Sequence, residues 1–245
     1  MSIKFKKIIF GLVWMFRVMK INSTARKYHK NPDMYLPQQR NTMLLRYAKK
    51  LIKIYNVDLK VTGYENLPKN GPALITPNHK SNIDPLVILA ALEKQEEGPD
   101  HFDKLATFVA KKELEKKKTM RNTMSLLDTF TIDRQNFREA LRTMNEFGAY
   151  IKENKTFGVV FPEGTRVKTD ALGEFKAGAF KVAQKNYLSV IPTTIKNSKE
   201  AFNSKRKGRV EVEVIFHKPI KASELITQET DALASRVQKI VESKL

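Results

Sequence analysis

The chain has 245 residues, and its 45 Lys and Arg against 26 Asp and Glu give a formal net charge of +19. This length is enough for one domain with a sizeable core and an appendage. Because the chain contains no cysteine, disulfides, thiolate metal sites and a cysteine nucleophile are excluded. The excess of positive charge favours a polyanionic partner: nucleic acid, an anionic membrane surface or an acidic protein.

Residues 5–21 are strongly apolar but are interrupted by cations, and no run reaches the ~18 apolar residues of a transmembrane helix. No cleavage site of small residues follows, so a secretory signal peptide is not supported. At about 100° per residue, Lys6, Arg17 and Lys20 fall on one stripe of a helix. This pattern is typical of a helix that lies in the membrane interface with its cations toward the head groups. A polar connector is expected over residues 22–39.

A second amphipathic helix is predicted over residues 41–56. Two interpretations stay open: an ordinary amphipathic helix packed on the core, or the second half of a membrane-docking hairpin. Two basic amphipathic helices in tandem favour the hairpin. We therefore predict an N-terminal two-helix membrane-interacting segment over residues 1–58 and an α/β domain over residues 59–245. The apolar stripe consists of Leu44, Ala48, Leu51 and Tyr55, and the cations on the opposite side are Arg46, Lys49, Lys50 and Lys53.

From Asp58 onward, strand and helix signals alternate along the chain. This alternation predicts an α/β fold with a mostly parallel central sheet flanked by helices. The expected strands are 59–63, 73–76, 105–110, 129–132, 157–161, 189–195 and 209–216. The expected helices are one from Pro85 to Leu92 and those over 135–153, 175–185 and 231–245.

A His and an Asp follow the buried strand 73–76 directly. His79 stands at the strand's end, where α/β folds usually place their chemistry. Asp84 precedes Pro85, so it is expected to cap the next helix, and the turn can also fold its carboxylate back onto His79. A carboxylate on one imidazole nitrogen leaves the other free as a base. A purely structural His79, and a Ser81 that only bonds the turn, remain alternatives. No obvious third ligand is nearby, so a metal site is not expected.

Two further strand ends present charged residues. Ile132-Asp133-Arg134 follows one strand, and Phe161-Pro-Glu-Gly-Thr-Arg166 follows another. A glycine lets a phosphate approach the main chain, and an arginine supplies a planar fork for its oxygens. Lys176, at the start of the next expected helix, could face the same anion. The alternatives are a plain surface turn, a helix cap and simple helix–sheet packing.

Together these blocks resemble the glycerolipid acyltransferase family, and the bacterial members that acylate 1-acyl-glycerol-3-phosphate are the most similar. The resemblance covers residues 59–216. It implies transfer of an acyl group from a thioester of coenzyme A or acyl-carrier protein to the free hydroxyl of lysophosphatidate, making phosphatidate without a cofactor. The four blocks are Asn78-His79-x-Ser81-x-x-Asp84, Ile132-Asp133-Arg134, Phe161-Pro-Glu-Gly-Thr-Arg166 with Phe175-Lys-x-Gly178, and Val190-Ile-Pro192.

The resemblance also assigns roles to residues. It implies His79 as general base with Asp84 as its orienting partner. It places Arg134, Glu163, Gly164, Thr165, Arg166 and Lys176 around the glycerophosphate. It further implies a peripheral or monotopic protein on the cytoplasmic face of the cell membrane.

One segment departs from the family pattern. After Leu114 the family usually has a Pro and then a Gly, whereas this chain continues as Glu115-Lys-Lys-Lys-Thr-Met-Arg121. The loop that shapes the acceptor or acyl pocket is therefore expected to be different and more basic.

Two alternatives to this function stay open. The nearer one is an acyltransferase or transacylase that acts on another lysophospholipid. The farther one is a non-enzymatic basic protein that binds membrane or nucleic acid. No known nucleic-acid-binding motif is present, so a nucleic-acid partner is not expected.

Overall fold

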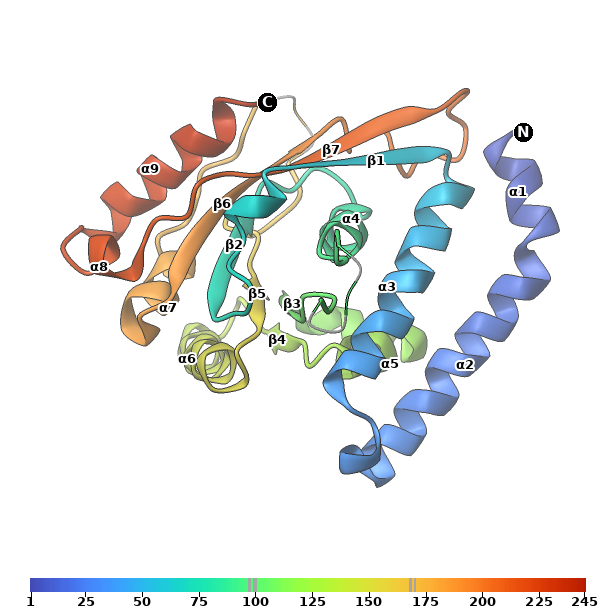
Figure 1. The fold of residues 1–245 in the computed structure, drawn as a ribbon, viewed down its shortest axis with the longest axis horizontal. Coiled ribbons are helices and arrows are strands. Elements are labelled where there is room, and N and C mark those ends of the chain that lie inside the picture. Colours follow the sequence, from blue (N-terminus) through green and yellow to red (C-terminus); the bar gives the residue numbers. More distant parts are fainter. Residues whose placement is uncertain (97, 99–100, 168, 170) are drawn as a thin grey trace.

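The computed structural model describes residues 1–96, 98, 101–167, 169 and 171–245. Its centre is a sheet of seven described strands in the order β1-β7-β6-β2-β5-β3-β4 (Figure 1). Among these strands, β6 and β7 are antiparallel and the other neighbours are parallel. The predicted mostly parallel α/β sheet is therefore confirmed. The strands are β1 (Val57–Thr62), β2 (Ala73–Pro77), β3 (Ala106–Lys111), β4 (Phe130–Ile132), β5 (Phe157–Val159), β6 (Ser189–Lys196) and β7 (Val210–Phe216).

Helices cover both faces of the sheet (Figure 1). β2 is buried along its whole length, and its side chains alternate between the two layers. Leu74 packs with Phe147 and Phe180, whereas Ile75 joins the cluster that contains Leu45. Burial on both faces explains why β2 is a continuous apolar run. One face carries α3 (Pro37–Ile54) and α4 (Asp84–Ala91), and the other carries α6 (Phe137–Asn154), α7 (Gly178–Asn186), α8 (Ala222–Leu225) and α9 (Thr230–Glu242).

The N-terminal residues form α1 (Ile3–Ile9) and α2 (Gly11–Lys30), which lie outside α3 (Figure 1). The expected polar connector over 22–39 is therefore wrong in its first half, because α2 continues to Lys30. The helix continues because Ile21 and Ala25, four residues apart on one side of it, are buried against the protein. Short 3-10 turns lie between the larger elements: η1 (Pro32–Met34), η2 (Tyr64–Asn66) and η3 (Lys112–Lys116).

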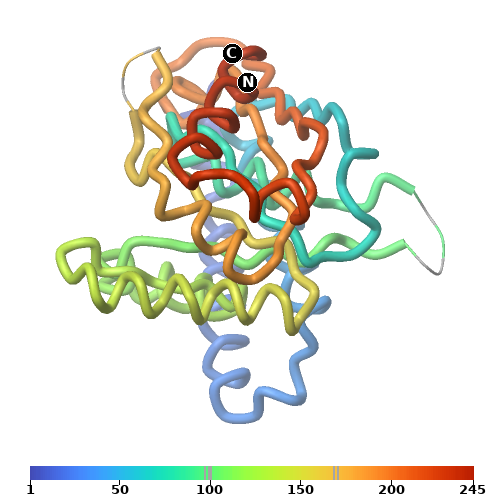
Figure 2. Tube along the Cα trace, turned by 90° about the vertical axis from the view of Figure 1, so that its left-hand side faces the viewer, coloured from blue at the N-terminus to red at the C-terminus, as the bar shows by residue number. Residues whose placement is uncertain are grey.

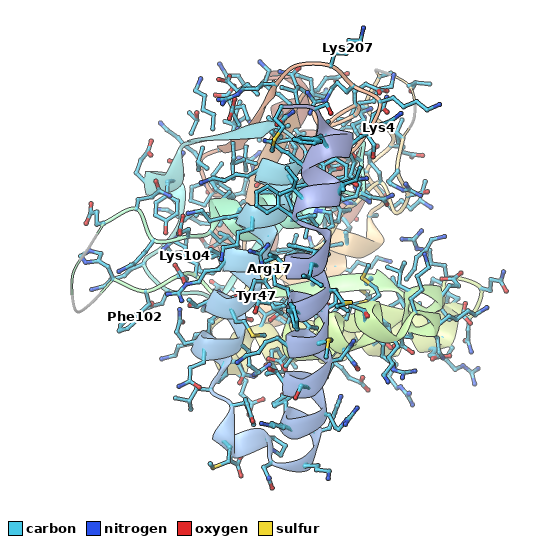
Figure 3. The ribbon with its side chains drawn as sticks, turned by 90° about the vertical axis from the view of Figure 1, so that its right-hand side faces the viewer. Lys4, Arg17, Tyr47, Phe102, Lys104 and Lys207 are labelled. Carbon is cyan, nitrogen blue, oxygen red and sulfur yellow. The ribbon has the colours of Figure 1, made fainter. Side chains whose placement is uncertain are left out.

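Two of the three cations assigned to the head-group stripe face the protein instead. The ammonium group of Lys6 donates to the carbonyl oxygen of Lys53 at 2.9 Å. Arg17 lies over the ring of Tyr47, 5.9 Å from its centroid, between α2 and α3 (Figure 3). Lys20 is exposed. The stripe prediction fails because it placed cations by angle alone, without the rings and carbonyls that α3 offers them.

The α3 helix packs its apolar side on the core, as the ordinary amphipathic alternative predicts. Leu44, Leu45, Ala48 and Ile52 are buried, whereas Leu51 is only half-buried. Exposed apolar side chains lie instead on α1 and α2. No single described helix is long and apolar enough to cross a membrane, but α1 and α2, bent by 64°, reach that length and composition together. The exposed apolar residues of α1 and α2 include Phe5, Ile8, Ile9, Leu12, Phe16 and Met19.

The register of the sheet brings two of the predicted blocks to one level. Ile75 and Phe108 both pair with Val159, so these three residues lie side by side across β2, β5 and β3. His79 and Glu163 each follow four residues after this level in their own strands. Because the strands are parallel, both residues leave the sheet at the same edge. We call this end of the sheet, from which His79 and Glu163 emerge, the catalytic edge, after the role predicted for His79.

Candidate active site

The predicted contact between His79 and Asp84 is present. Nδ1 of His79 lies 2.8 Å from Oδ2 of Asp84, and the Asp84 carboxylate is fully buried. Since an ionised carboxylate can only accept, Nδ1 carries the proton and Nε2 keeps its lone pair. The His79 side chain is 17% exposed, so the free nitrogen can meet a substrate at the catalytic edge.

Asp84 does not cap the helix, contrary to the capping prediction. It is the first residue of α4, and its Oδ2 turns back to accept hydrogen bonds from the main-chain N–H groups of Lys80 and Ser81 at 2.7 and 2.8 Å. With His79, three donors therefore converge on one oxygen. This arrangement fixes the position of the carboxylate and through it the tautomer and the plane of the imidazole.

Glu163 holds the neighbouring turn to the histidine. Its Oε1 accepts a hydrogen bond from the His79 N–H at 2.6 Å, and its Oε2 accepts one from Gly173 N–H at 3.0 Å. The carbonyl oxygen of His79 in turn accepts from Val167 N–H at 2.9 Å. Glu163 is buried, with both oxygens occupied by main-chain amides. Its carboxylate therefore ties together the turn, His79 and the loop at Gly173.

Burial raises the pKa of the Glu163 carboxyl above its usual value, while the hydrogen bonds from the amides of His79 and Gly173 act in the opposite direction. The dominant cause is the removal of the charged carboxylate from water. The same burial strengthens the two hydrogen bonds from the main-chain amides, because little water competes for the carboxylate.

The turn after Glu163 offers several groups to an anion. Gly164 has φ +70°, a left-handed conformation that suits glycine, and the aliphatic part of the Lys176 side chain passes over it. Arg166 and Thr165 are exposed, and within the described residues neither their side chains nor their main-chain N–H groups have a hydrogen-bond partner. Free amides after a left-handed residue form a concave site of the kind that binds anions.

Arg134 reaches the same edge from farther away. Ile132 pairs with Lys111, three residues beyond the Phe108 level, so Arg134 stands at a height similar to that of His79. β5 and β3 lie between β2 and β4, a separation of roughly 14 Å at the usual strand spacing of ~4.8 Å. The structure thus brings His79, Asp84 and the Glu163–Arg166 turn into contact, and it places Arg134 on the same edge without contact.

The acyltransferase family model matches residues 58–196, more than half of the chain. The chain belongs to the acyltransferase family. It is 35% identical over 217 residues to the probable 1-acyl-sn-glycerol-3-phosphate acyltransferase of Mycoplasma pneumoniae, a match that covers 84% of this chain and 79% of that protein. It is 31% identical over 188 residues to the 1-acyl-sn-glycerol-3-phosphate acyltransferase of Saccharomyces cerevisiae, covering 74% of this chain and 58% of the yeast protein.

A crystal structure of the 1-acyl-sn-glycerophosphate (LPA) acyltransferase PlsC from Thermotoga maritima has the same fold. The TM-score is 0.73 at 22% identity, and the match covers 99% of this chain and 92% of that chain. The predicted family and the prediction of an acyltransferase enzyme are therefore confirmed, and the non-enzymatic alternative is removed.

Two residues of this acyltransferase shape the site without having been assigned a role from the sequence. The Phe161 ring stacks on the His79 imidazole with 4.2 Å between the centroids. The Asn78 side chain exchanges two hydrogen bonds with the main chain of Ile195, at 3.0 and 2.7 Å, which ties the strand end to β6. Both lie inside the sequence blocks that carry the family resemblance, but a block does not say which of its residues point inward.

The segment that departs from the family pattern is ordered in this acyltransferase. Residues Lys112–Lys116 form η3 and residues Lys118–Leu126 form α5, a helix that the sequence analysis missed. The cations of this segment are exposed, as expected for a more basic segment. Within the described residues, no three side chains of His, Asp or Glu gather in a way that could hold a metal ion.

Proposed function

We propose that this acyltransferase moves an acyl group from a thioester of coenzyme A or acyl-carrier protein to the free hydroxyl of 1-acyl-glycerol-3-phosphate, making phosphatidate. The observation that carries the proposal is the His79–Asp84 pair at 2.8 Å beside a turn whose Arg166 side chain and main-chain amides have no partner among the described residues. A base for a hydroxyl thus lies next to a site for a phosphate. The names of the relatives point to the same acceptor.

The reaction needs one base and no covalent enzyme intermediate. Nε2 of His79 takes the proton of the acceptor hydroxyl as its oxygen attacks the thioester carbonyl carbon. When the tetrahedral intermediate collapses, the carbon–sulfur bond breaks and the imidazolium returns the proton to the thiolate. General base catalysis of this kind contributes about 10²–10⁴ in rate, and fixing the two substrates side by side supplies much of the rest.

The phosphate of the acceptor is held by the turn that follows β5. The Arg166 guanidinium and the free N–H groups of Thr165 and Arg166 bind its oxygens, while Lys176 passes over Gly164 from α7. Arg134 approaches from β4 and contacts the far side of the same head group. Glu163 contributes indirectly, because it fixes the position of this turn relative to His79.

The enzyme works at a membrane surface. The exposed apolar residues of α1 and α2 enter the interface, and the net charge of +19 favours anionic head groups. We assign the contact to the cytoplasmic face of the membrane, as a peripheral or monotopic association. In this arrangement the hairpin partner of α2 is α1, since α3 packs on the core.

Mass spectrometry of products tests this function. The purified chain, bound to vesicles, is offered acyl-coenzyme A or acyl-carrier protein thioester together with lysophosphatidate or another lysophospholipid. Phosphatidate formed from lysophosphatidate with at least one of the two donors is the expected result. Acylation of a different lysophospholipid alone, or a diacyl product formed without any thioester, would overturn the proposal.

A further inference from the structure

The first two turns of α6 carry apolar side chains that nothing in the described part of the chain covers. The apolar stripe of this helix is fully buried at its C-terminal end, where Phe147 and Ile151 pack on the sheet. At its N-terminal end, Phe137 is 80% exposed and Leu141 is 47% exposed. Residues four apart lie on one side of a helix, so these two form a single patch. Exposed apolar groups of this kind mark an interaction surface.

The patch is held on a well-formed helix end. The Asn136 side chain accepts a hydrogen bond from Glu139 N–H at 3.1 Å and caps α6. The Glu139 carboxylate pairs with Lys112 at 2.7 Å, which joins the helix end to η3. The backbone that carries Phe137 and Leu141 is therefore held in place.

Two cations border the apolar patch on α6. Arg138 and Arg142 are exposed and lie next to it at about 100° per residue around the helix. Leu114 and Met120 are also exposed, among the cations of the preceding segment. We call residues 112–145, which comprise η3, α5, β4 and the first half of α6, the arm. Its other exposed cations are Lys112, Lys116, Lys117, Lys118, Arg121 and Arg134.

The arm projects from the body on the side of the catalytic edge. β4 pairs with Val109–Lys111, the part of β3 that extends beyond its pairing with β5. Figure 2 shows the green and yellow-green segment reaching away from the rest of the molecule. Its α5 helix is bonded to α2, since Asn22 accepts from the Asn122 amide at 2.8 Å. The arm is thus continuous with the helices that carry the other exposed apolar residues.

From these observations, and resting on the proposed function, we propose that the arm is a second contact with the anionic lipid surface. Phe137 and Leu141 enter the interface, and Arg138 and Arg142 bind head-group phosphates. An apolar patch bordered by cations is the composition of helices that lie in a membrane interface, and each cation there is worth about a fivefold gain in binding. A symmetric contact with a second copy would instead set this cationic surface against itself.

Two contacts fix the orientation of the enzyme. A single contact through α1 and α2 leaves the protein free to rotate about the axis of these helices. A second contact, through the arm, holds the catalytic edge toward the lipid. Joining two weak contacts on one body also strengthens the association without new chemistry.

A fluorescent probe at the patch tests the proposal directly. Phe137→Trp is made in a Trp14→Phe background, because Trp14 is the chain's single tryptophan. The protein is added to vesicles of phosphatidylglycerol and phosphatidylcholine with brominated acyl chains. The indole emission should shift to the blue and be quenched. An unshifted, unquenched indole in protein that sediments with the vesicles would overturn the second contact.

Matched substitutions provide an independent measurement. The double variant Phe137→Glu with Leu141→Glu should bind these vesicles at least about tenfold more weakly, since each apolar group buried contributes roughly that factor. Ile226→Glu, at an exposed apolar residue outside the arm, is the control and should bind like the wild type. Equal binding by all three proteins would contradict the proposal. So would a double variant whose only change is a lower oligomeric mass, because this would identify a contact between copies.

The outcome is separable from that of the proposed function. Vesicle binding and quenching need no turnover, so the arm can be confirmed even if no phosphatidate forms. On a short-chain lysophosphatidate below its micelle concentration, the double variant should turn over like the wild type. Loss of that basal turnover together with a lowered melting temperature would show that the patch stabilises the fold instead.

Discussion

The carboxylate of Glu163 accepts a hydrogen bond from the main-chain N–H of His79, with 2.6 Å between Oε1 and the nitrogen. His79, the proposed catalytic base, and the turn proposed to bind phosphate are thereby fixed to each other by one buried side chain. The remaining oxygen of Glu163 holds Gly173, at the far end of the same loop. In the proposed mechanism, substrate alignment therefore depends on a residue that need not touch the substrate.

The pH dependence of stability tests the environment of Glu163. Because its folded pKa is raised above 4.5, the residue contributes stability that is fully present below the unfolded pKa and is lost as pH rises through the folded value. The unfolding free energy of wild type minus that of Glu163→Gln should therefore fall as pH rises from about 4 upward. Denaturant unfolding at several pH values measures it. Glu174→Gln, at an exposed position, is the matched control, and a wild-type minus Glu163→Gln difference that grows with pH would contradict the burial argument.

Asp84→Asn should reduce turnover less than loss of the imidazole does. An asparagine can place its oxygen where Oδ2 accepts the three donors, so the His79 tautomer is kept. Its amide then takes the place of Oδ1, which is buried and has no partner among the described residues. We expect a loss of about 10–100-fold in kcat, because a charge-assisted bond becomes a neutral one. Initial-rate assays of phosphatidate formation at several pH values measure this loss in kcat. A loss equal to that of His79→Ala would show that the tautomer is not kept.

Arg166→Lys should lower kcat/KM for lysophosphatidate by about one to two orders of magnitude, since lysine cannot reproduce a two-point contact with phosphate. The melting temperature should stay the same. Among the described residues, Arg166 makes no ion pair with Glu163, whose two oxygens each accept from a main-chain amide. Kinetics on acceptors with and without the phosphate monoester, together with a melting curve, distinguish a role in phosphate binding from a role in stabilising the turn. An equal fall in kcat/KM for both kinds of acceptor, with a lower melting temperature, would contradict the proposed contact between Arg166 and the phosphate.

The outer face of α2 should govern vesicle binding. Leu12→Glu with Phe16→Glu places two charges on exposed positions, so the fold should be unaffected while sedimentation with anionic vesicles falls at least tenfold. Phe102→Glu, at an exposed loop position, is the matched control. If the double variant sediments with the vesicles as well as the wild type does, α2 is not the membrane contact.

Sequence reasoning found the parts of this fold that local patterns encode. Alternating apolar runs and turn residues located the strands, and His79 and Asp84 were paired because they are close in the chain. The two N-terminal helices were also visible, but their orientation was not. The apolar faces of α2 and α3 look alike in sequence, and only packing shows that α3 turns its face inward.

The contributions that sequence reasoning missed come from contacts between distant segments. The role of Glu163 depends on main-chain amides of His79 and Gly173, which carry no residue-specific signal. The α5 helix was missed because its lysine-rich start resembles a solvated loop. The inward cations Lys6 and Arg17 find carbonyl and ring partners on α3 that a single-helix projection does not contain.

The most direct measurement of the central claim is product formation by His79→Ala. The variant should lose about 10²–10⁴ of the phosphatidate formed from lysophosphatidate and an acyl thioester, because no other base replaces Nε2. Its melting curve and vesicle binding should match the wild type, since the Asp84 carboxylate keeps its bonds to the amides of Lys80 and Ser81. Near wild-type phosphatidate formation by a folded, vesicle-bound His79→Ala would contradict the account.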